Sequence, residues 1–286
     1  MKKVALVLSS GGARGFAHIG AIEALEEEGY EITSISGTSM GALIGGMYAA
    51  GRIAEVKEWL FSTDSRSLIS LVDPSLSMNH LVKGDKVMNA LLEIMPDVEI
   101  SNLPIPFSAV ATDLKNYEEV VFSSGSLYDA IRSSISIPLF FKPQKRNERV
   151  LIDGGVINPL PLNRVKRIEG DILVSVNVSA RGDSNFEYRI RRMQNARKES
   201  GSRLGKMIPS LSKEVDSNFY SMLNKTFALM IQRNSELMAE LYVPDIQVDI
   251  PMNRFGGFDY DKAEKIIRKG KQEMKESLLI YNKIKQ

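Results

Sequence analysis

A serine in a glycine frame is the residue of this chain whose setting most favours chemistry. Ser39 lies in the run Gly37-Thr38-Ser39-Met40-Gly41, between a strand-like stretch at 32–36 and a stretch of small residues at 41–50. This spacing matches a G-x-S-x-G nucleophile elbow, in which a sharp strand-to-helix turn exposes the serine hydroxyl. Gly37 and Gly41 leave room for the turn and for a substrate. A plain serine N-cap of the following helix is the structural alternative.

A serine nucleophile needs a base, and the sequence offers few histidines. The chain contains only His18 and His80. His18 lies inside the first predicted helix, and His80 lies in an irregular stretch at 73–83 without a recognisable acidic partner. No histidine follows residue 80, whereas α/β-hydrolases place the histidine after both the serine and the acid. A conventional serine–histidine–acid triad is therefore not expected.

Asp153 is the better candidate for the base. It ends the apolar run 150–152 and precedes Gly154 and Gly155, which permit a sharp turn. Sites in open parallel sheets form beyond the carboxyl ends of the strands. Ser39 also follows a predicted strand, so the two side chains can share one edge of the sheet. Taken alone, the Asp-Gly-Gly run fits an ordinary turn equally well.

A third element is the loop Ser10-Gly11-Gly12-Ala13-Arg14-Gly15, between the first predicted strand and the first helix. Backbone N–H groups at a helix N-terminus bind anions, so this loop suits an oxyanion, a phosphate or both. It departs from the dinucleotide-binding pattern, because Ser10 stands where a glycine is needed and no acidic residue ends the next strand.

The elements that must position these residues alternate between strand and helix. The apolar run at 4–8 predicts a buried strand, and the strand-like run at 32–36 predicts a second one. Helical spacing predicts a helix at 15–29, and the small residues at 41–50 predict another. This order indicates an α/β fold with a mainly parallel sheet flanked by helices. Further strands are predicted at 105–111, 119–122, 150–152, 172–178 and 246–250, and further helices at 84–94, 126–135, 213–241 and 259–284.

Composition narrows the classes of function. The 286 residues carry a net charge of +2, which gives no global electrostatic reason to expect nucleic acid binding. The chain has no cysteine, which excludes disulfides and thiolate chemistry and suits a cytoplasmic location. We expect a single domain over 1–286, with a basic, mobile insertion around 181–206 and a helical C-terminal part at 211–286.

Together, the three motifs resemble the patatin-like phospholipase family, especially bacterial members similar to the catalytic domain of neuropathy target esterase. The likeness rests on residues 11–20, on the Ser39 elbow, and on the Asp153 turn with Asn158, Pro159 and Pro161 beyond it. Residues 130–138 also look like the family's segment before the aspartate, and residues 255–258 extend the likeness more loosely.

The resemblance implies a patatin-like three-layer architecture and a Ser-Asp dyad. Ser39 matches the nucleophile, Asp153 matches its acid/base partner, and the N–H groups of Gly11, Gly12, Ala13 and Arg14 match the oxyanion hole. His18 matches a position that favours a structural role. Ser10 departs from the family's usual glycine, which puts the role of that first loop residue in question. The implied substrate is an acyl lipid, and neither a metal nor a cofactor is expected.

Other interpretations stay open at this point. The same acyl-enzyme serves an acyltransferase, and the same fold serves a regulatory or adaptor protein with little turnover. The helix at 213–241 suits the core better than a lipid-facing lid. The basic segment 181–206 suits peripheral contact with an anionic membrane on its inner face, although a solvated loop is the commoner outcome for such a run.

Overall fold

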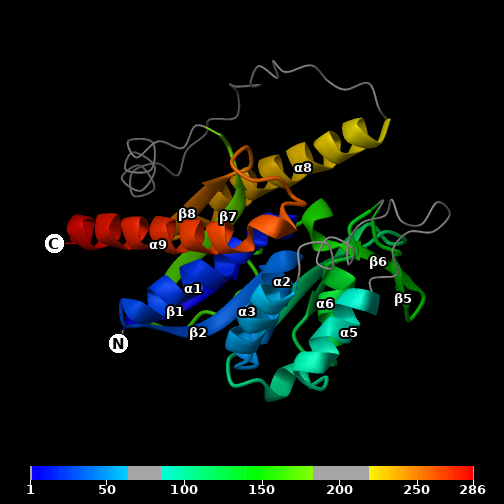
Figure 1. Cartoon of the computed structure of the whole chain (residues 1–286), viewed down its shortest axis with the longest axis horizontal. Helices are drawn as coiled ribbons and strands as arrows, with labels where there is room; N and C mark the ends of the chain where they lie inside the picture. The colour runs from blue at the N-terminus through cyan, green and yellow to red at the C-terminus, as the bar shows by residue number, and fades with distance from the viewer. Residues whose placement is uncertain (1, 64–84, 139, 183–218, 286) are drawn as a thin grey trace.

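The computed structural model describes residues 2–63, 85–138, 140–182 and 219–285. Its centre is an eight-stranded sheet with the order β5-β6-β3-β2-β1-β7-β8, and β4 pairs with β3 off this path (Figure 1). The strands are β1 (Lys2–Leu8), β2 (Tyr30–Thr38), β3 (Phe107–Asp113), β4 (Glu118–Phe122), β5 (Gln144–Arg146), β6 (Arg149–Asp153), β7 (Ile172–Ala180) and β8 (Ile246–Pro251).

Five neighbouring strands, β3, β2, β1, β7 and β8, run parallel. Their apolar residues pack against helices on both sides of the sheet, and every residue of β3 and β7 is buried. β1 divides its side chains between the two faces: Val4, Leu6 and Leu8 join the larger core, whereas Ala5 and Val7 join the smaller one. The expected mainly parallel α/β sheet is confirmed.

The remaining edge of the sheet is antiparallel, whereas Asp153 was expected at the carboxyl end of a parallel strand. β6 runs antiparallel to β3, with Asp153 opposite Ala111. β2 runs parallel to β3, with Thr38 opposite Val110. Asp153 therefore does not end a parallel strand. It reaches the level of Ser39 because β6 enters from beyond the carboxyl edge and pairs with the last residues of β3.

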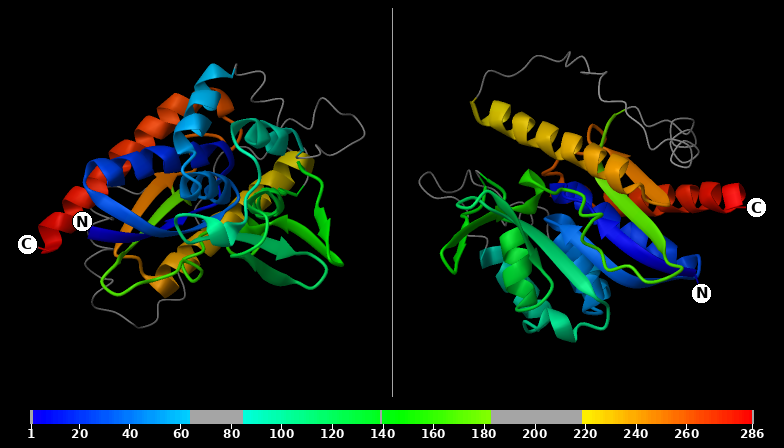
Figure 2. Two further views of the ribbon diagram at one scale, coloured as in Figure 1. Left: turned by 90° about the horizontal axis from the view of Figure 1, so that it is seen from below. Right: turned by 180° about the vertical axis from the view of Figure 1, so that it is seen from behind.

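Helices cover both faces of the sheet in three layers (Figures 1 and 2). One face carries α1, α2, α6 and α9, whose apolar residues form the larger core with β1 and β2. The other face carries α8, which packs on β7. The longer helices are α1 (Ala17–Glu27), α2 (Met40–Ala49), α3 (Ile53–Ser62), α5 (Asp85–Ile94), α6 (Leu127–Ser134), α8 (Phe219–Tyr242) and α9 (Ala263–Lys285); the short 3-10 helices are η1 (Gly12–Phe16), η3 (Ile100–Asn102), η4 (Gly154–Val156) and η5 (Tyr260–Lys262).

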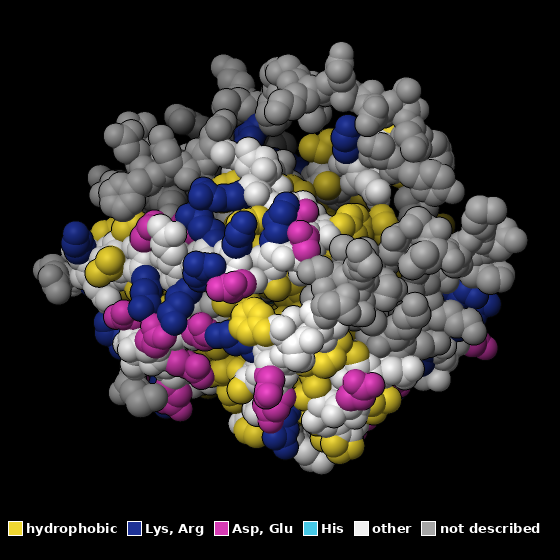
Figure 3. Space-filling model, viewed as in Figure 1, with side chains coloured by type: hydrophobic (Ala, Val, Ile, Leu, Met, Phe, Trp, Pro, Cys, Tyr) yellow, Lys and Arg dark blue, Asp and Glu magenta, His cyan; other side chains and the backbone are white. Residues whose placement is uncertain are grey.

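Most predicted helices occur in the structure, and α3 is an addition that the sequence did not predict. The first residues of the helix predicted at 213–241 lie outside the described part, as do His80 and nearly all of the basic segment 181–206. Among the described helices, none combines the length and the apolar character needed to cross a bilayer. Basic and acidic side chains gather near one another on the left of the face in Figure 3. Ion pairs such as Lys275–Glu27 join charges of this kind.

Candidate active site

The Ser39 elbow is a strained turn between β2 and α2. Ser39 has φ 57° and ψ −121°, a backbone conformation that residues other than glycine rarely adopt. Gly41 permits the close packing of this turn, because a Cβ there would lie 2.2 Å from the carbonyl oxygen of Leu8. Strain of this kind costs of order 1–3 kcal/mol and is typical of functional sites.

Ser39 and Asp153 are in direct contact. Ser39 Oγ donates a hydrogen bond to Asp153 Oδ2 at 2.5 Å. Both side chains are almost fully buried, with exposed fractions of 2% and 0%. The backbone N–H of Ser39 donates to Ser134 Oγ at 2.8 Å, which fixes the elbow from the side of α6. The structure thus brings together the two residues that the sequence singled out, 114 positions apart along the chain.

The environment of Asp153 makes its carboxyl group a stronger base than an ordinary aspartate. Burial raises the pKa of Asp153 to about 7, while the hydrogen bonds from Ser39 and from the Gly155 N–H oppose this rise. The Gly155 N–H donates to Asp153 Oδ1 at 2.7 Å, so the second glycine after the strand orients the carboxylate. Gly154 begins the short turn η4 that carries this N–H. A group with a pKa near 7 is well matched to proton transfer at neutral pH.

The glycine loop approaches the same site from the end of β1. Gly12 has φ +58°, and a Cβ at this position would lie 2.5 Å from the carbonyl oxygen of Gly257. The N–H of Ala13 donates to that same oxygen at 2.8 Å. Ala13 was expected to donate its N–H to an oxyanion, but in the structure this N–H is already bonded to Gly257. Within the described chain, the N–H groups of Gly11 and Gly12 have no hydrogen-bond acceptor.

The side chain of Arg14 anchors the loop to the sheet. Its Nε donates to the carbonyl oxygen of Val178 at 2.9 Å. Burial lowers the pKa of Arg14 to about 10, against the opposing influence of the Asp259 and Tyr260 charges, so the guanidinium is charged at neutral pH. Arg14 thus fixes the loop against the end of β7 through its side chain.

His18 is a structural residue of α1. Its Nε2 lies 2.9 Å from the carbonyl oxygen of Ser9, at the start of the glycine loop. Burial lowers the pKa of His18 to about 4, partly opposed by this hydrogen bond, so the ring is neutral at pH 7. His18 Nε2 thus holds the loop in place, and no hydrogen bond joins His18 to Ser39 among the described residues.

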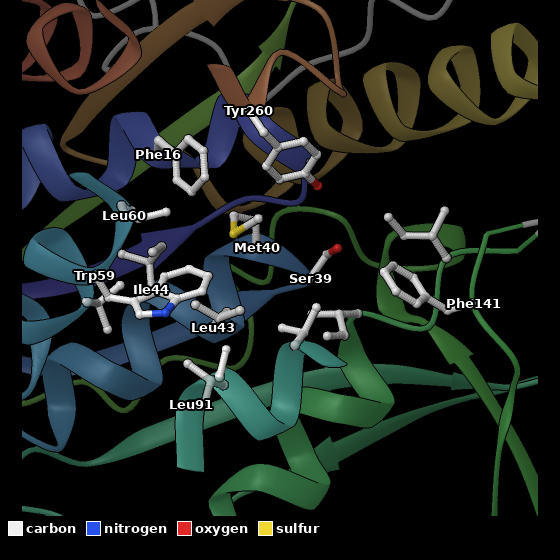
Figure 4. A pocket seen from close by; sticks show the side chains of 16 residues that line it. Phe16, Ser39, Met40, Leu43, Ile44, Trp59, Leu60, Leu91, Phe141 and Tyr260 are labelled. Carbon is white, nitrogen blue, oxygen red and sulfur yellow. The ribbon is translucent and has the colours of Figure 1, made fainter. Parts of the chain in front are cut away.

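An apolar pocket opens in front of Ser39 (Figure 4). Phe16 and Tyr260 lie on one side of it, and Leu43, Ile44 and Trp59 lie on the other. Gly12 and Ser39 also line it, so the nucleophile and the loop face the same space. The remaining lining residues, from α2, α3, α5 and the segment after α6, are Met40, Val56, Leu60, Val87, Ala90, Leu91, Ile135, Ile137 and Phe141. The pocket suits a hydrocarbon chain, because the described residues that line it include no charged side chain.

Ser134 is a site residue whose role the sequence analysis did not identify. Its hydroxyl accepts from the Ser39 N–H and donates to the carbonyl oxygen of Val110 at 2.6 Å, thereby linking the elbow to β3. The neighbouring Ser136 carbonyl accepts from the Asp153 N–H at 2.9 Å. Both serines lie in the segment 130–138, which is part of the family likeness. That likeness was the one feature of the sequence that could have pointed to Ser134.

Comparison with known proteins finds relatives in sequence. The profile of the family described as patatin-like phospholipase matches residues 6–165. An uncharacterized NTE family protein of Mycobacterium tuberculosis is 45% identical over 177 residues, which are 62% of this chain and 49% of that protein. The human patatin-like phospholipase domain-containing protein 6 is 30% identical over 194 residues, 64% of this chain and 14% of that protein.

The chain thus spans about half the length of the mycobacterial relative and a smaller share of the human one. Among solved structures, VipD from Legionella pneumophila aligns with 99% of this chain and 67% of its own, at 16% identity and a TM-score of 0.49.

Proposed function

Since the chain belongs to the patatin-like phospholipase family, we propose that it is a serine acyl hydrolase that cleaves lipid esters. The observation that carries this proposal is the hydrogen bond from Ser39 Oγ to Asp153 Oδ2, made beside an apolar pocket. A nucleophile, its base and a chain-binding pocket in one place fit the hydrolysis of an acyl lipid such as a phospholipid or lysophospholipid.

In the first half of the reaction, Ser39 Oγ attacks the ester carbonyl carbon while its proton passes to Asp153 Oδ2. The carbonyl oxygen becomes an oxyanion, for which the N–H groups of Gly11 and Gly12 are the available donors in the loop. The ester C–O bond then breaks, and the alcohol oxygen takes the proton from Asp153. The products of this half are the free alcohol and an acyl-enzyme on Ser39.

In the second half, water attacks the acyl carbon and gives its proton to Asp153. The bond to Ser39 Oγ breaks, and Ser39 recovers the proton from Asp153. The pKa of Asp153, raised to about 7 by burial, lets one carboxyl group both accept and return this proton at neutral pH. The N-terminus of α2 begins directly after Ser39, and its positive dipole end favours the transient negative charge.

The test compares labelling by a fluorophosphonate probe with hydrolysis of an octanoyl ester. Ser39→Ala should lose the label, and Ser39→Ala and Asp153→Asn should each lose about 10³-fold or more in kcat. Ser101→Ala, at an exposed serine on η3, is the matched control and should keep both signals. A folded Ser39→Ala protein with the wild-type rate would contradict the proposal. A folded wild type that neither labels nor hydrolyses esters would support the adaptor alternative.

A further inference from the structure

A second pocket, separate from the apolar one, adjoins the glycine loop. It lies between α8 and the loop at 255–258, and it is lined by Ser10, Gly11 and Gly12 together with Phe227, Ile231 and Phe258. Phe140 and Phe258 close one wall, with ring centroids 4.6 Å apart. The two pockets share Gly12 and Ile137, so they meet at the point where the proposed oxyanion forms.

The two pockets differ in charge. Among the described residues, none that lines the pocket containing Ser39 is charged, whereas Arg14 and Lys225 line the second pocket. Asp259, whose charge acts on Arg14, does not line the pocket; it is bonded to Lys262 at 2.8 Å and to the N–H of Gly256 at 2.9 Å. Within the described part of the chain, Lys225 has no carboxylate at ion-pair distance. The described residues that line the second pocket therefore carry two positive charges and no negative one.

An ester bound at Ser39 must direct its acyl chain and its alcohol part into different spaces, because the two diverge at the carbonyl carbon. An anionic alcohol part would lose its hydration without compensation in the apolar pocket. In the second pocket it would find Lys225 at the mouth and apolar walls for the carbon atoms next to the ester. We propose that this pocket binds the alcohol part of the lipid ester, and that Lys225 favours alcohols bearing an anionic group such as a phosphate.

This inference rests on the proposed function, and it adds a specificity-determining residue to it. When the ester C–O bond breaks, the alcohol oxygen takes the proton held by Asp153 and the alcohol leaves through the second pocket. Lys225 acts on binding of the alcohol part, several bonds from the reacting atoms. Arg14 adds positive charge to the same pocket while its Nε remains bonded to Val178.

The experiment uses the full chain and two esters with the same acyl group, octanoyl glycerol 3-phosphate and octanoyl glycerol. Both are used as monomers below the micelle concentration, so that attraction to a lipid surface cannot contribute. The ratio of kcat/KM for the anionic ester to that for the neutral ester should fall about 3- to 10-fold in Lys225→Gln, the range of a solvent-accessible ion pair. Lys283→Gln, which removes an equal charge from the exposed end of α9, should leave the ratio unchanged.

A second variant tests the pocket itself. Ala228 lines it, so Ala228→Trp should lower kcat/KM for both glycerol esters relative to methyl octanoate, whose alcohol part is small. Thr226→Trp places the same side chain at an exposed position of α8 and is the control. An unchanged ratio in folded Lys225→Gln, or an equal loss for all esters in Ala228→Trp, would overturn the inference. Hydrolysis of none of the three esters by the wild type would overturn the proposed function and this inference with it.

Discussion

At the scale of single residues, two features set Ser39 and Asp153 apart from structural residues: a strained backbone and a shifted acidity. Ser39 combines φ 57° with a buried hydroxyl. Asp153 is buried beside neutral partners, the Ser39 hydroxyl and the Gly155 N–H. Neither arrangement favours stability, since a relaxed turn and an apolar side chain would serve the fold better. Each feature leads to a separate prediction.

The pH dependence of hydrolysis should follow the ionisation of Asp153. The free protein must carry an ionised Asp153 to accept the Ser39 proton, and burial raises the pKa of this group to about 7. We expect kcat/KM to rise with pH and to reach half its plateau near pH 7. The pKa of His18 lies at about 4, so His18→Gln should leave the midpoint in place. A midpoint near the ordinary aspartate value, or one that moves in His18→Gln, would contradict the role of Asp153.

Backbone strain at Ser39 predicts an unusual order of stabilities. Ser39→Ala and Ser39→Gly both remove the hydroxyl, but only glycine relaxes the positive φ. We expect Ser39→Gly to be the more stable by about 1 kcal/mol, measured by urea unfolding. At Ser101, in a 3-10 helix without positive φ, the alanine variant should be the more stable. The same order at both sites would mean that the elbow holds no strain.

At the scale of elements, the parallel strands and the turns that follow them could be predicted from the sequence. β1 and β7 contain apolar runs bounded by loops, and such runs need only local information to be identified. The reversed direction of β6 could not be predicted in this way, because its pairing with β3 joins residues about forty positions apart. The bond from Ala13 to Gly257 is another long-range contact, and no local pattern reports that an N–H is occupied.

The candidate site shows the same division between local and long-range information. The side chains of Ser39 and Asp153 carry their own local signals, a glycine frame and a strand end. The pocket is assembled from α2, α3, α5 and residues near α9, and it has no pattern of its own in the sequence. The order of apolar side chains along one helix indicates only that one face is buried. It does not distinguish a core contact from a pocket wall.

The pocket wall formed by α5 leads to a prediction about chain length. Ala90 lines the pocket and is half-buried, so a larger side chain there fills empty space rather than packed core. Ala90→Phe should lower kcat/KM for long acyl chains by about 10-fold or more relative to short ones, since each methylene that is kept in water forgoes about 0.8 kcal/mol. Asn89→Phe adds the same ring to the exposed face of α5 and should not change the preference. An equal loss for short and long chains would contradict this assignment of the pocket.

At the scale of the whole molecule, the site is held where three separate parts of the chain meet. The elbow comes from the parallel sheet, Asp153 from the antiparallel edge, and the Gly257 carbonyl from the segment between β8 and α9. Many buried contacts must therefore form to keep Asp153 away from water. The free energy that these contacts supply is partly offset by the cost of burying an ionised carboxyl group. Stability and the proposed activity should then respond to pH in opposite directions.

This opposition can be measured by comparing the wild type with Asp153→Asn. Because burial raises the pKa of Asp153 from 3.8 to about 7, the folded state binds a proton more tightly than the unfolded state. The contribution of Asp153 to stability is thus fully present below pH 4 and is lost as the pH rises through about 7. Asparagine does not titrate in this range. The free energy of unfolding of the variant, relative to that of the wild type, should therefore rise by on the order of 1 kcal/mol or more between pH 5 and pH 8. Urea unfolding at these two pH values tests the prediction, and a constant difference between the proteins would show that Asp153 keeps an ordinary pKa in the folded chain.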